Sequence, residues 1–235
     1  MHHTVCNSLR ISPIMLLALL LLPMPALASP AITCHCFTDR SYDAARPAAA
    51  DPYLLATTQN SFFAIVFNTD KKGIVLKKQQ GTSSDDLWIA YWAASKKGLS
   101  PESLLQARQK HGTWNNALAA LQLTPKTLGV RFSTALNARS SSAALAGTVV
   151  DELFLRYRLL TDAELAAVRK AGASNQELII ATVISVRTKQ SARQTYLDAK
   201  NGTKTWGEML LWANIDTKNM QREIAAILTL HPEQN

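Results

Sequence analysis

A ten-residue turn that occurs twice constrains this chain more than any other feature of its sequence. The two copies span residues 81–90 and 172–181 and read GTSSDDLWIA and GASNQELIIA. Each begins with a glycine, which adopts left-handed backbone conformations without steric cost and often ends a helix. A serine follows, whose side chain can accept hydrogen bonds from the first N–H groups of the next helix, and Ser174 with Glu177 has the spacing of a capping box. The turn therefore predicts the end of one helix and the start of another.

The similarity between the two copies extends beyond the turn. A shift of 91 residues aligns the two turns (172 − 81 = 91), and a shift of 92 aligns Trp114 with Trp206 (206 − 114 = 92). A short insertion at residues 203–204 accounts for the difference. We therefore predict that residues 60–128 and 151–220 are two copies of one unit, with chance matching of amphipathic helices as the alternative.

A second glycine turn occurs in each copy. Gly112 and Gly202 also follow basic amphipathic segments and precede apolar ones, at a spacing that suits one helix–turn–helix hairpin. Trp114 and Trp206 come shortly after these turns. Because repeated positions usually serve the packing of the repeat, we expect both rings in the core, although aromatic walls of a ligand groove are the alternative.

Proline and capping residues indicate where the helices begin. Asp51 and Pro52 predict the start of the first helix, with proline at the first helical position. Thr124 and Pro125 predict the start of a sixth helix, which would carry Leu128, Val130 and Phe132. No stretch alternates apolar and polar residues with the period of a strand.

The pattern as a whole predicts an all-α protein. We expect duplicated helix–turn–helix hairpins, packed as a bundle or as a short array resembling an α-solenoid. An extended segment is predicted over residues 29–51, a first half over 52–138, a linker over 139–144 around three serines, and a second half over 145–235.

The start of the chain has the composition of a targeting segment. Arg10 precedes an apolar run over residues 15–22, which is too short to span a bilayer, and residues 26–28 form an Ala-x-Ala cleavage site. We expect a signal peptide over residues 1–28, cleavage after Ala28, and a periplasmic or secreted chain with no transmembrane helix. An uncleaved membrane anchor is the alternative.

The chain is basic, with 25 Lys and Arg against 17 Asp and Glu and a net charge of +8. Outside the cytoplasm such a charge favours anionic partners, such as lipid headgroups, acidic cell-wall polymers or acidic proteins. The charges are dispersed along the predicted helices instead of being massed in a tail. Ordinary solvated helix faces are therefore the competing interpretation.

Cys34, His35 and Cys36 form the one cluster of reactive side chains after the predicted cleavage site. Thiolates and imidazole are good zinc or copper ligands, but the spacing is shorter than in zinc sites and no second cysteine pair follows. A disulfide between neighbouring cysteines would close a small strained ring, and pairing between chains is also open. A disulfide, a metal site and unpaired thiols are the alternatives, and a thiol-redox or metal-handling protein is our second hypothesis.

The sequence contains none of the short motifs of nucleophilic, metalloprotease, phosphate-binding or dinucleotide-binding sites. His111 ends a predicted helix, where a cation interacts well with the helix dipole. Residues 104–123 resemble the helix–turn–helix of DNA-binding domains, and the basic charge agrees with that interpretation. We therefore predict no catalytic residue and no cofactor, and nucleic-acid binding is our third hypothesis because an exported protein rarely meets DNA.

The run Thr33-Cys34-His35-Cys36-Phe37 and the turn over residues 81–90 together resemble exported bacterial helical proteins of uncharacterised function. The resemblance implies a secreted helical fold and assigns no functional residue. Our leading hypothesis is an exported helical-repeat protein that binds a protein or an anionic polymer of the cell envelope, and that is not an enzyme. Stacked hairpins offer the concave surface that such binding uses.

Overall fold

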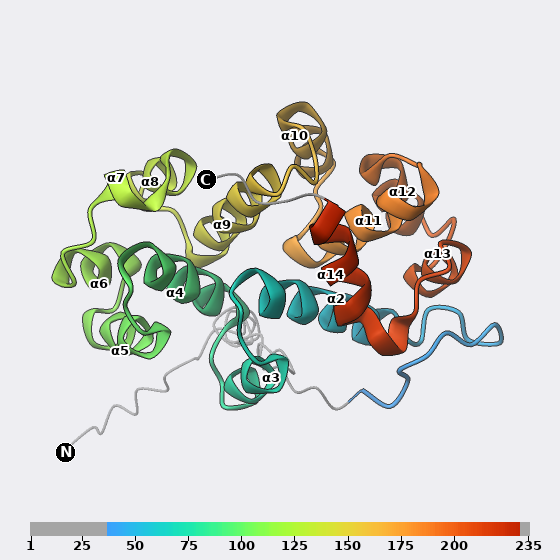
Figure 1. Cartoon of the computed structure of the whole chain (residues 1–235), viewed down its shortest axis with the longest axis horizontal. Helices are drawn as coiled ribbons and strands as arrows, with labels where there is room; N and C mark the ends of the chain where they lie inside the picture. Colours follow the sequence, from blue (N-terminus) through green and yellow to red (C-terminus); the bar gives the residue numbers. More distant parts are fainter. Residues whose placement is uncertain (1–36, 231–235) are drawn as a thin grey trace, which may run out of the picture. The chain divides into compact units, whose positions relative to one another are not determined.

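The computed structural model describes residues 37–230, except for the side chains of residues 125 and 126, and its regular elements are all helices (Figure 1). Residues 37–50 form turns and bends that lead into the first of these helices. No strand occurs in the described part, and consecutive helices pack as hairpins. The predicted all-α fold is therefore confirmed. The predicted signal peptide and the last five residues lie outside the described range.

The helices form two series with the same order. The first series is α2 (Asp51–Val66), α3 (Lys71–Gln79), α4 (Ser84–Lys97), α5 (Pro101–His111), α6 (Trp114–Ala120), α7 (Pro125–Leu128) and α8 (Val130–Asn137). The second series is α9 (Ser142–Arg156), α10 (Asp162–Lys170), α11 (Asn175–Thr188), α12 (Ala192–Lys200), α13 (Trp206–Trp212), the 3₁₀ turn η2 (Thr217–Asn219) and α14 (Met220–Leu230).

Three pairs of corresponding helices have identical lengths, and three others differ by one to three residues, with 16 and 15 in α2 and α9, 11 and 9 in α5 and α12, and 8 and 11 in α8 and α14. Helices α3 and α10 both have 9 residues, α4 and α11 both have 14, and α6 and α13 both have 7. The agreement of order, length and turn sequence makes the first series the counterpart of the second, helix for helix.

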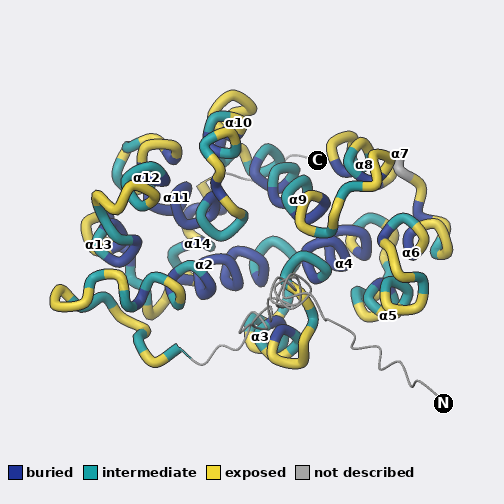
Figure 2. Tube along the Cα trace, turned by 180° about the vertical axis from the view of Figure 1, so that it is seen from behind, coloured by how far each residue is buried: buried dark blue, intermediate teal, exposed yellow. Residues whose placement is uncertain are grey.

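Each series contributes its first helix to the other. Helix α2 packs along α11 and α14 of the second series, and α9 packs along α4 and α8 of the first (Figure 1). Helix α2 corresponds to α9, α4 to α11 and α8 to α14. The same set of helix contacts therefore occurs twice, once with the first helix of the first series packed on the second series and once with the first helix of the second series packed on the first. The two series therefore share one core, and Figure 2 shows buried residues along α2, α4, α9 and α11.

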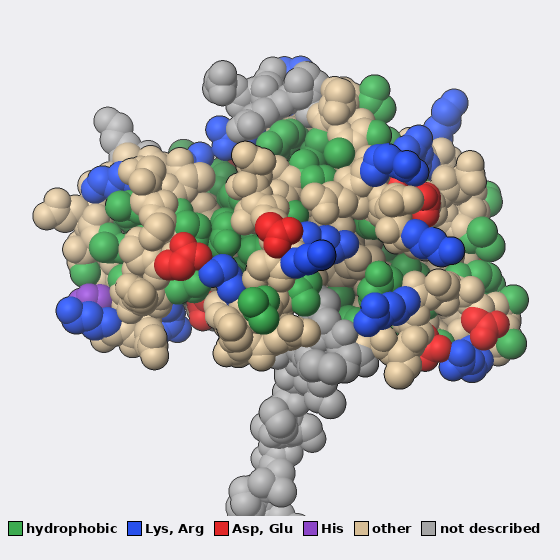
Figure 3. Space-filling view, turned by 60° about the horizontal axis from the view of Figure 1, so that its bottom comes forward, with side chains coloured by type: hydrophobic (Ala, Val, Ile, Leu, Met, Phe, Trp, Pro, Cys, Tyr) green, Lys and Arg blue, Asp and Glu red, His purple; other side chains and the backbone are tan. Residues whose placement is uncertain are grey.

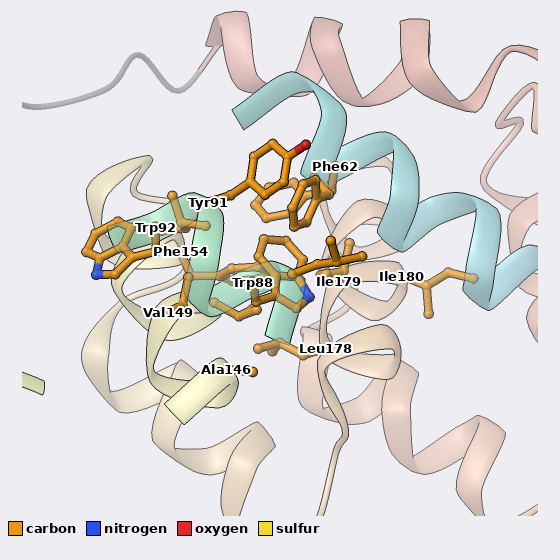
Figure 4. Close-up of a cluster of buried hydrophobic side chains, with 14 of the residues drawn as sticks. Phe62, Trp88, Tyr91, Trp92, Ala146, Val149, Phe154, Leu178, Ile179 and Ile180 are labelled. Carbon is orange, nitrogen blue, oxygen red and sulfur yellow. The ribbon is translucent and has the colours of Figure 1, made fainter. Parts of the chain in front are cut away.

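The shared core is centred on Trp88 of α4 (Figure 4). The centroid of its ring lies 4.6 Å from that of Phe63 and 6.2 Å from that of Phe62, both on α2. Phe62 in turn lies 5.6 Å from Phe154 of α9, and Ile179 of α11 lies beside the same cluster in Figure 4. All five side chains are buried, so helices of both series are held together by apolar burial and by contacts between aromatic rings.

The repeated turn connects α3 to α4 in the first series and α10 to α11 in the second. Gly81 and Gly172 have φ of 95° and 103°, which only glycine adopts at little cost. Ser83 accepts a hydrogen bond from the N–H of Asp86, and Ser174 forms a complete capping box with Glu177. Local chemistry therefore fixes the same two helix ends in each series.

Two predictions about helix boundaries are corrected by the structure. The predicted sixth helix is not continuous, because Gly129, with φ of 93°, separates α7 from α8 and leaves Val130 82% exposed. Helix α9 begins at Ser142, inside the predicted linker, where the side chain of Ser141 accepts from the N–H of Ala144. Within residues 37–230, no helix combines the length and the apolar character needed to cross a membrane.

Candidate functional site: an aromatic groove

The residues predicted from the repeated turns lie between packed helices. Gly112 and Gly202 have φ of 76° and 70° and follow the ends of α5 and α12. Trp114 and Trp206 are 3% and 5% exposed, and the indole N–H of Trp114 donates to Oδ1 of Asp86 at 2.7 Å. These four residues shape the hairpins, and the two tryptophan rings pack in the interior.

The predicted redox or metal cluster, Cys34, His35 and Cys36, lies outside the described residues. Within the described range, no group of three or more His, Cys, Asp or Glu side chains is placed to hold a metal ion.

The segment that resembles a DNA-binding helix–turn–helix corresponds to α5 and α6. Helix α6, which would be the recognition helix, buries Trp114, Ala117 and Leu118. Its seven residues, WNNALAA, include no Lys or Arg, the side chains that most often contact phosphates. One face of α6 therefore packs on the core of the protein.

A groove of about 890 Å³ opens where α4, the end of α2, the start of α5 and the end of α9 meet. We call it the aromatic groove, and its walls include Phe67, Tyr91, Trp92, Leu99 and Tyr157. Both series contribute to it, because Phe67, Tyr91 and Trp92 belong to the first and Tyr157 to the second. A groove of this volume lies in the size range of ligand-binding clefts, and its lining combines aromatic rings with polar and charged side chains.

Hydrogen bonds and ring contacts hold the aromatic walls in place. The indole N–H of Trp92 donates to the backbone carbonyl of Leu128 at 2.9 Å, which fixes the orientation of the ring. Tyr91 lies 5.7 Å from Phe67 and 4.9 Å from the buried Phe63, measured between ring centroids. The walls are therefore preorganised, which lowers the conformational entropy that the protein must lose when a ligand binds.

The charges around the groove are mainly positive. The ammonium group of Lys96 lies 3.9 Å from the centroid of the Trp92 ring, within the range of a cation–π interaction, and Arg156 also lines the groove. The one acidic side chain of the lining, Glu102, accepts a hydrogen bond from Lys77 at 2.7 Å. That hydrogen bond lowers the pKa of Glu102 and raises the pKa of Lys77, so both groups stay charged and neutralise each other.

At the corresponding place in the second series, the described residues enclose a much smaller space. Tyr91 and Trp92 correspond to Thr182 and Val183, which line a cavity of only about 10 Å³. The space there is filled by apolar side chains of α14, namely Ile224, Ile227 and Leu228. The repeat itself can therefore be built without an open groove.

The aromatic groove is not among the features predicted from the sequence. Tyr91 and Trp92 are only 9% and 3% exposed, so each ring serves both the core and the groove wall. A comparison of the two copies would have detected them, because their counterparts Thr182 and Val183 are not aromatic.

Basic side chains do not gather around any single point of the face drawn in Figure 3. Lys and Arg side chains are spread over this face, with Asp and Glu side chains between them. This face offers no continuous basic stripe of the kind that follows a polyanion.

Searches of protein-family models, of curated proteins and of solved structures give no match to this chain. The geometry described above is therefore the basis for assigning a function.

Proposed function

We propose that this protein is a non-enzymatic binding protein that holds a segment of a partner protein in the aromatic groove. One observation carries the proposal: the groove is open in one series and filled in the other, although the helices correspond. A difference of about 890 Å³ against about 10 Å³ between two copies of one unit is not required by the packing of the unit.

The lining indicates the chemistry of the bound segment. Rigid aromatic walls favour an apolar or aromatic side chain of the partner, since large rings dominate the energetics of protein interfaces. Lys96 and Arg156 at the same groove favour acidic residues next to that anchor. The expected ligand is therefore a short segment with an aromatic or aliphatic anchor and neighbouring carboxylates.

A selection from a displayed random-peptide library tests this proposal. The selected peptides should combine an apolar anchor with Asp or Glu, and their affinity should fall by about tenfold or more in Phe67→Ala and in Tyr157→Ala. Leu76→Ala and Leu230→Ala are matched controls, because these side chains are 53% and 73% exposed and lie outside the groove. Peptides that bind the groove variants as tightly as the parent would refute the proposal.

The location of the protein belongs to the same proposal. The predicted signal peptide places this binding protein in the periplasm or in the secreted fraction. N-terminal sequencing of the processed chain should therefore give Ser29 as its first residue.

The thiol-redox or metal-handling hypothesis is tested separately, by thiol titration and metal analysis of the processed chain before and after Cys34→Ser and Cys36→Ser. Nothing in the described residues favours that hypothesis or the nucleic-acid hypothesis over the groove.

A further inference from the structure

Helix α13 presents two large apolar side chains to solvent. Leu211 is 65% exposed and Trp212 is 54% exposed. The other four of the five tryptophans, Trp88, Trp92, Trp114 and Trp206, are between 0% and 5% exposed. A contiguous exposed apolar patch can mark a binding surface, and these two large side chains are adjacent in sequence.

The first series lacks this feature. Leu211 and Trp212 correspond to Ala119 and Ala120 at the end of α6, in the same alignment that matches Trp206 with Trp114. A seven-residue helix at this place therefore packs well with two alanines. The large side chains do not serve the fold of the repeat.

A second difference between the two series lies at the same place. The insertion that precedes α13 includes Lys204, whose ammonium group lies 4.7 Å from the centroid of the Trp212 ring. The insertion and the Leu-Trp pair occur in the same copy and build one surface, in which a cation lies over an exposed indole. We call Lys204, Leu211 and Trp212 the α13 surface.

The α13 surface stands on a rigid helix. The opposite side of α13 buries Trp206, Met209 and Leu210. Its first N–H groups are bound by Asp51 of α2, whose carboxylate accepts from Trp206 at 3.1 Å and from Gly207 at 3.0 Å. A helix fixed at both its buried side and its start presents its exposed side chains in one orientation.

We propose that the α13 surface binds the surface of an anionic lipid bilayer. An indole prefers the region between lipid headgroups and acyl chains, a neighbouring leucine adds apolar area below it, and the Lys204 ammonium group can contact lipid phosphates. The net charge of +8 adds a long-range attraction to such a surface. This association is peripheral, through side chains of one helix end, and it does not depend on the aromatic groove.

Binding to lipid vesicles tests the proposal. The chain is mixed with vesicles of phosphatidylcholine alone or with added phosphatidylglycerol, and bound protein is measured by sedimentation. Both the full chain and the chain that begins at Ser29 are used, because the apolar run over residues 15–22 can bind lipid by itself. We expect both chains to bind the vesicles that contain phosphatidylglycerol.

The decisive variant is Leu211→Ala/Trp212→Ala, which recreates the alanine pair of the first series. We expect it to weaken binding to the anionic vesicles by about tenfold or more. Lys204→Ala should weaken binding less and reduce its dependence on salt. The double variant Leu76→Ala/Leu230→Ala removes exposed apolar side chains elsewhere and should bind like the parent.

Tryptophan fluorescence gives an independent measurement on the same samples. Since Trp212 is the exposed tryptophan, lipids with brominated acyl chains should quench the parent and leave Trp212→Ala nearly unquenched. The proposal is overturned if the Leu211→Ala/Trp212→Ala variant binds as tightly as the parent. Equal binding to both vesicle types, or no binding of the parent to the anionic vesicles, also overturns it.

Discussion

The ammonium group of Lys78 donates a hydrogen bond of 2.6 Å to Oδ1 of Asn60 in the interior of the protein. The corresponding pair in the second series is Arg169 and Asp151, whose closest nitrogen and oxygen atoms are 2.7 Å apart. One series thus places a cation beside a neutral amide, where the other has an ion pair. Because Lys78 is only 8% exposed, burial lowers its pKa from 10.5 to about 8, although the charge of Asp85 opposes this shift.

The lowered pKa of Lys78 predicts how stability changes with pH. Between about pH 8 and pH 10.5 the unfolded chain holds the proton of Lys78 and the folded chain releases it, so the free energy of unfolding should rise with pH. The shift corresponds to at most about 3 kcal/mol from this residue. Burial lowers the pKa of Lys71 as well, which adds a contribution of the same sign.

Urea unfolding of the parent and of Lys78→Met, at several pH values between 7 and 10, checks this prediction. The variant lacks the titrating group, so its free energy of unfolding should rise less over the interval than that of the parent. Parallel pH profiles for the two proteins would show that Lys78 does not titrate in this range.

Asn60→Asp should give the first series the ion pair that the second has. A carboxylate next to the buried ammonium group favours the charged lysine, so the pKa of Lys78 should rise and the gain in stability above pH 8 should shrink. Titration of the lysine by NMR in the parent and in Asn60→Asp measures the shift directly. Asn60→Leu is the control, because it removes the hydrogen bond without adding charge and should lower the pKa of Lys78 further. A pKa that does not rise in Asn60→Asp contradicts the role assigned to this pair.

Lys189→Gly should stabilise the protein. Lys189 ends α11 with φ of 61°, whereas its counterpart in the first series, at the end of α4, is Gly98 with φ of 65°. A left-handed residue with a side chain costs about 1 kcal/mol or more, so glycine should raise the free energy of unfolding by up to about that amount. Lys72→Gly makes the same chemical change at an exposed position inside α3 and should lower stability by up to about 1 kcal/mol. Thermal unfolding of both variants should give shifts of opposite sign, and a loss of stability in Lys189→Gly would contradict the prediction.

The sequence predicts those parts of the fold that depend on a few neighbouring residues. Glycine and serine turns locate the ends of α3, α4, α10 and α11, since the capping groups lie within three or four residues of the N–H groups that they bind. The fold class follows from these turns and from the apolar period between them.

Features that depend on distant residues could not be predicted in this way. Asp51 begins α2, as predicted, but the sequence does not predict that its carboxylate accepts hydrogen bonds from the N–H groups of Trp206 and Gly207, far along the chain. The aromatic groove likewise depends on α9 lying beside α4, so that Tyr157 comes close to Trp92. A single sequence carries no local pattern for such neighbours, although the differences between its two copies point to the residues concerned.

Each half of the protein completes the core of the other, with α2 packed on α11 and α14, and α9 packed on α4 and α8. Residues 37–138 and 139–230, prepared as separate chains and compared with their mixture by circular dichroism and urea unfolding, test this claim directly. We expect each chain alone to show weak helicity and no cooperative unfolding transition, and we expect the equimolar mixture to regain both. A half that alone shows the full helicity of its segment and unfolds cooperatively would contradict the claim.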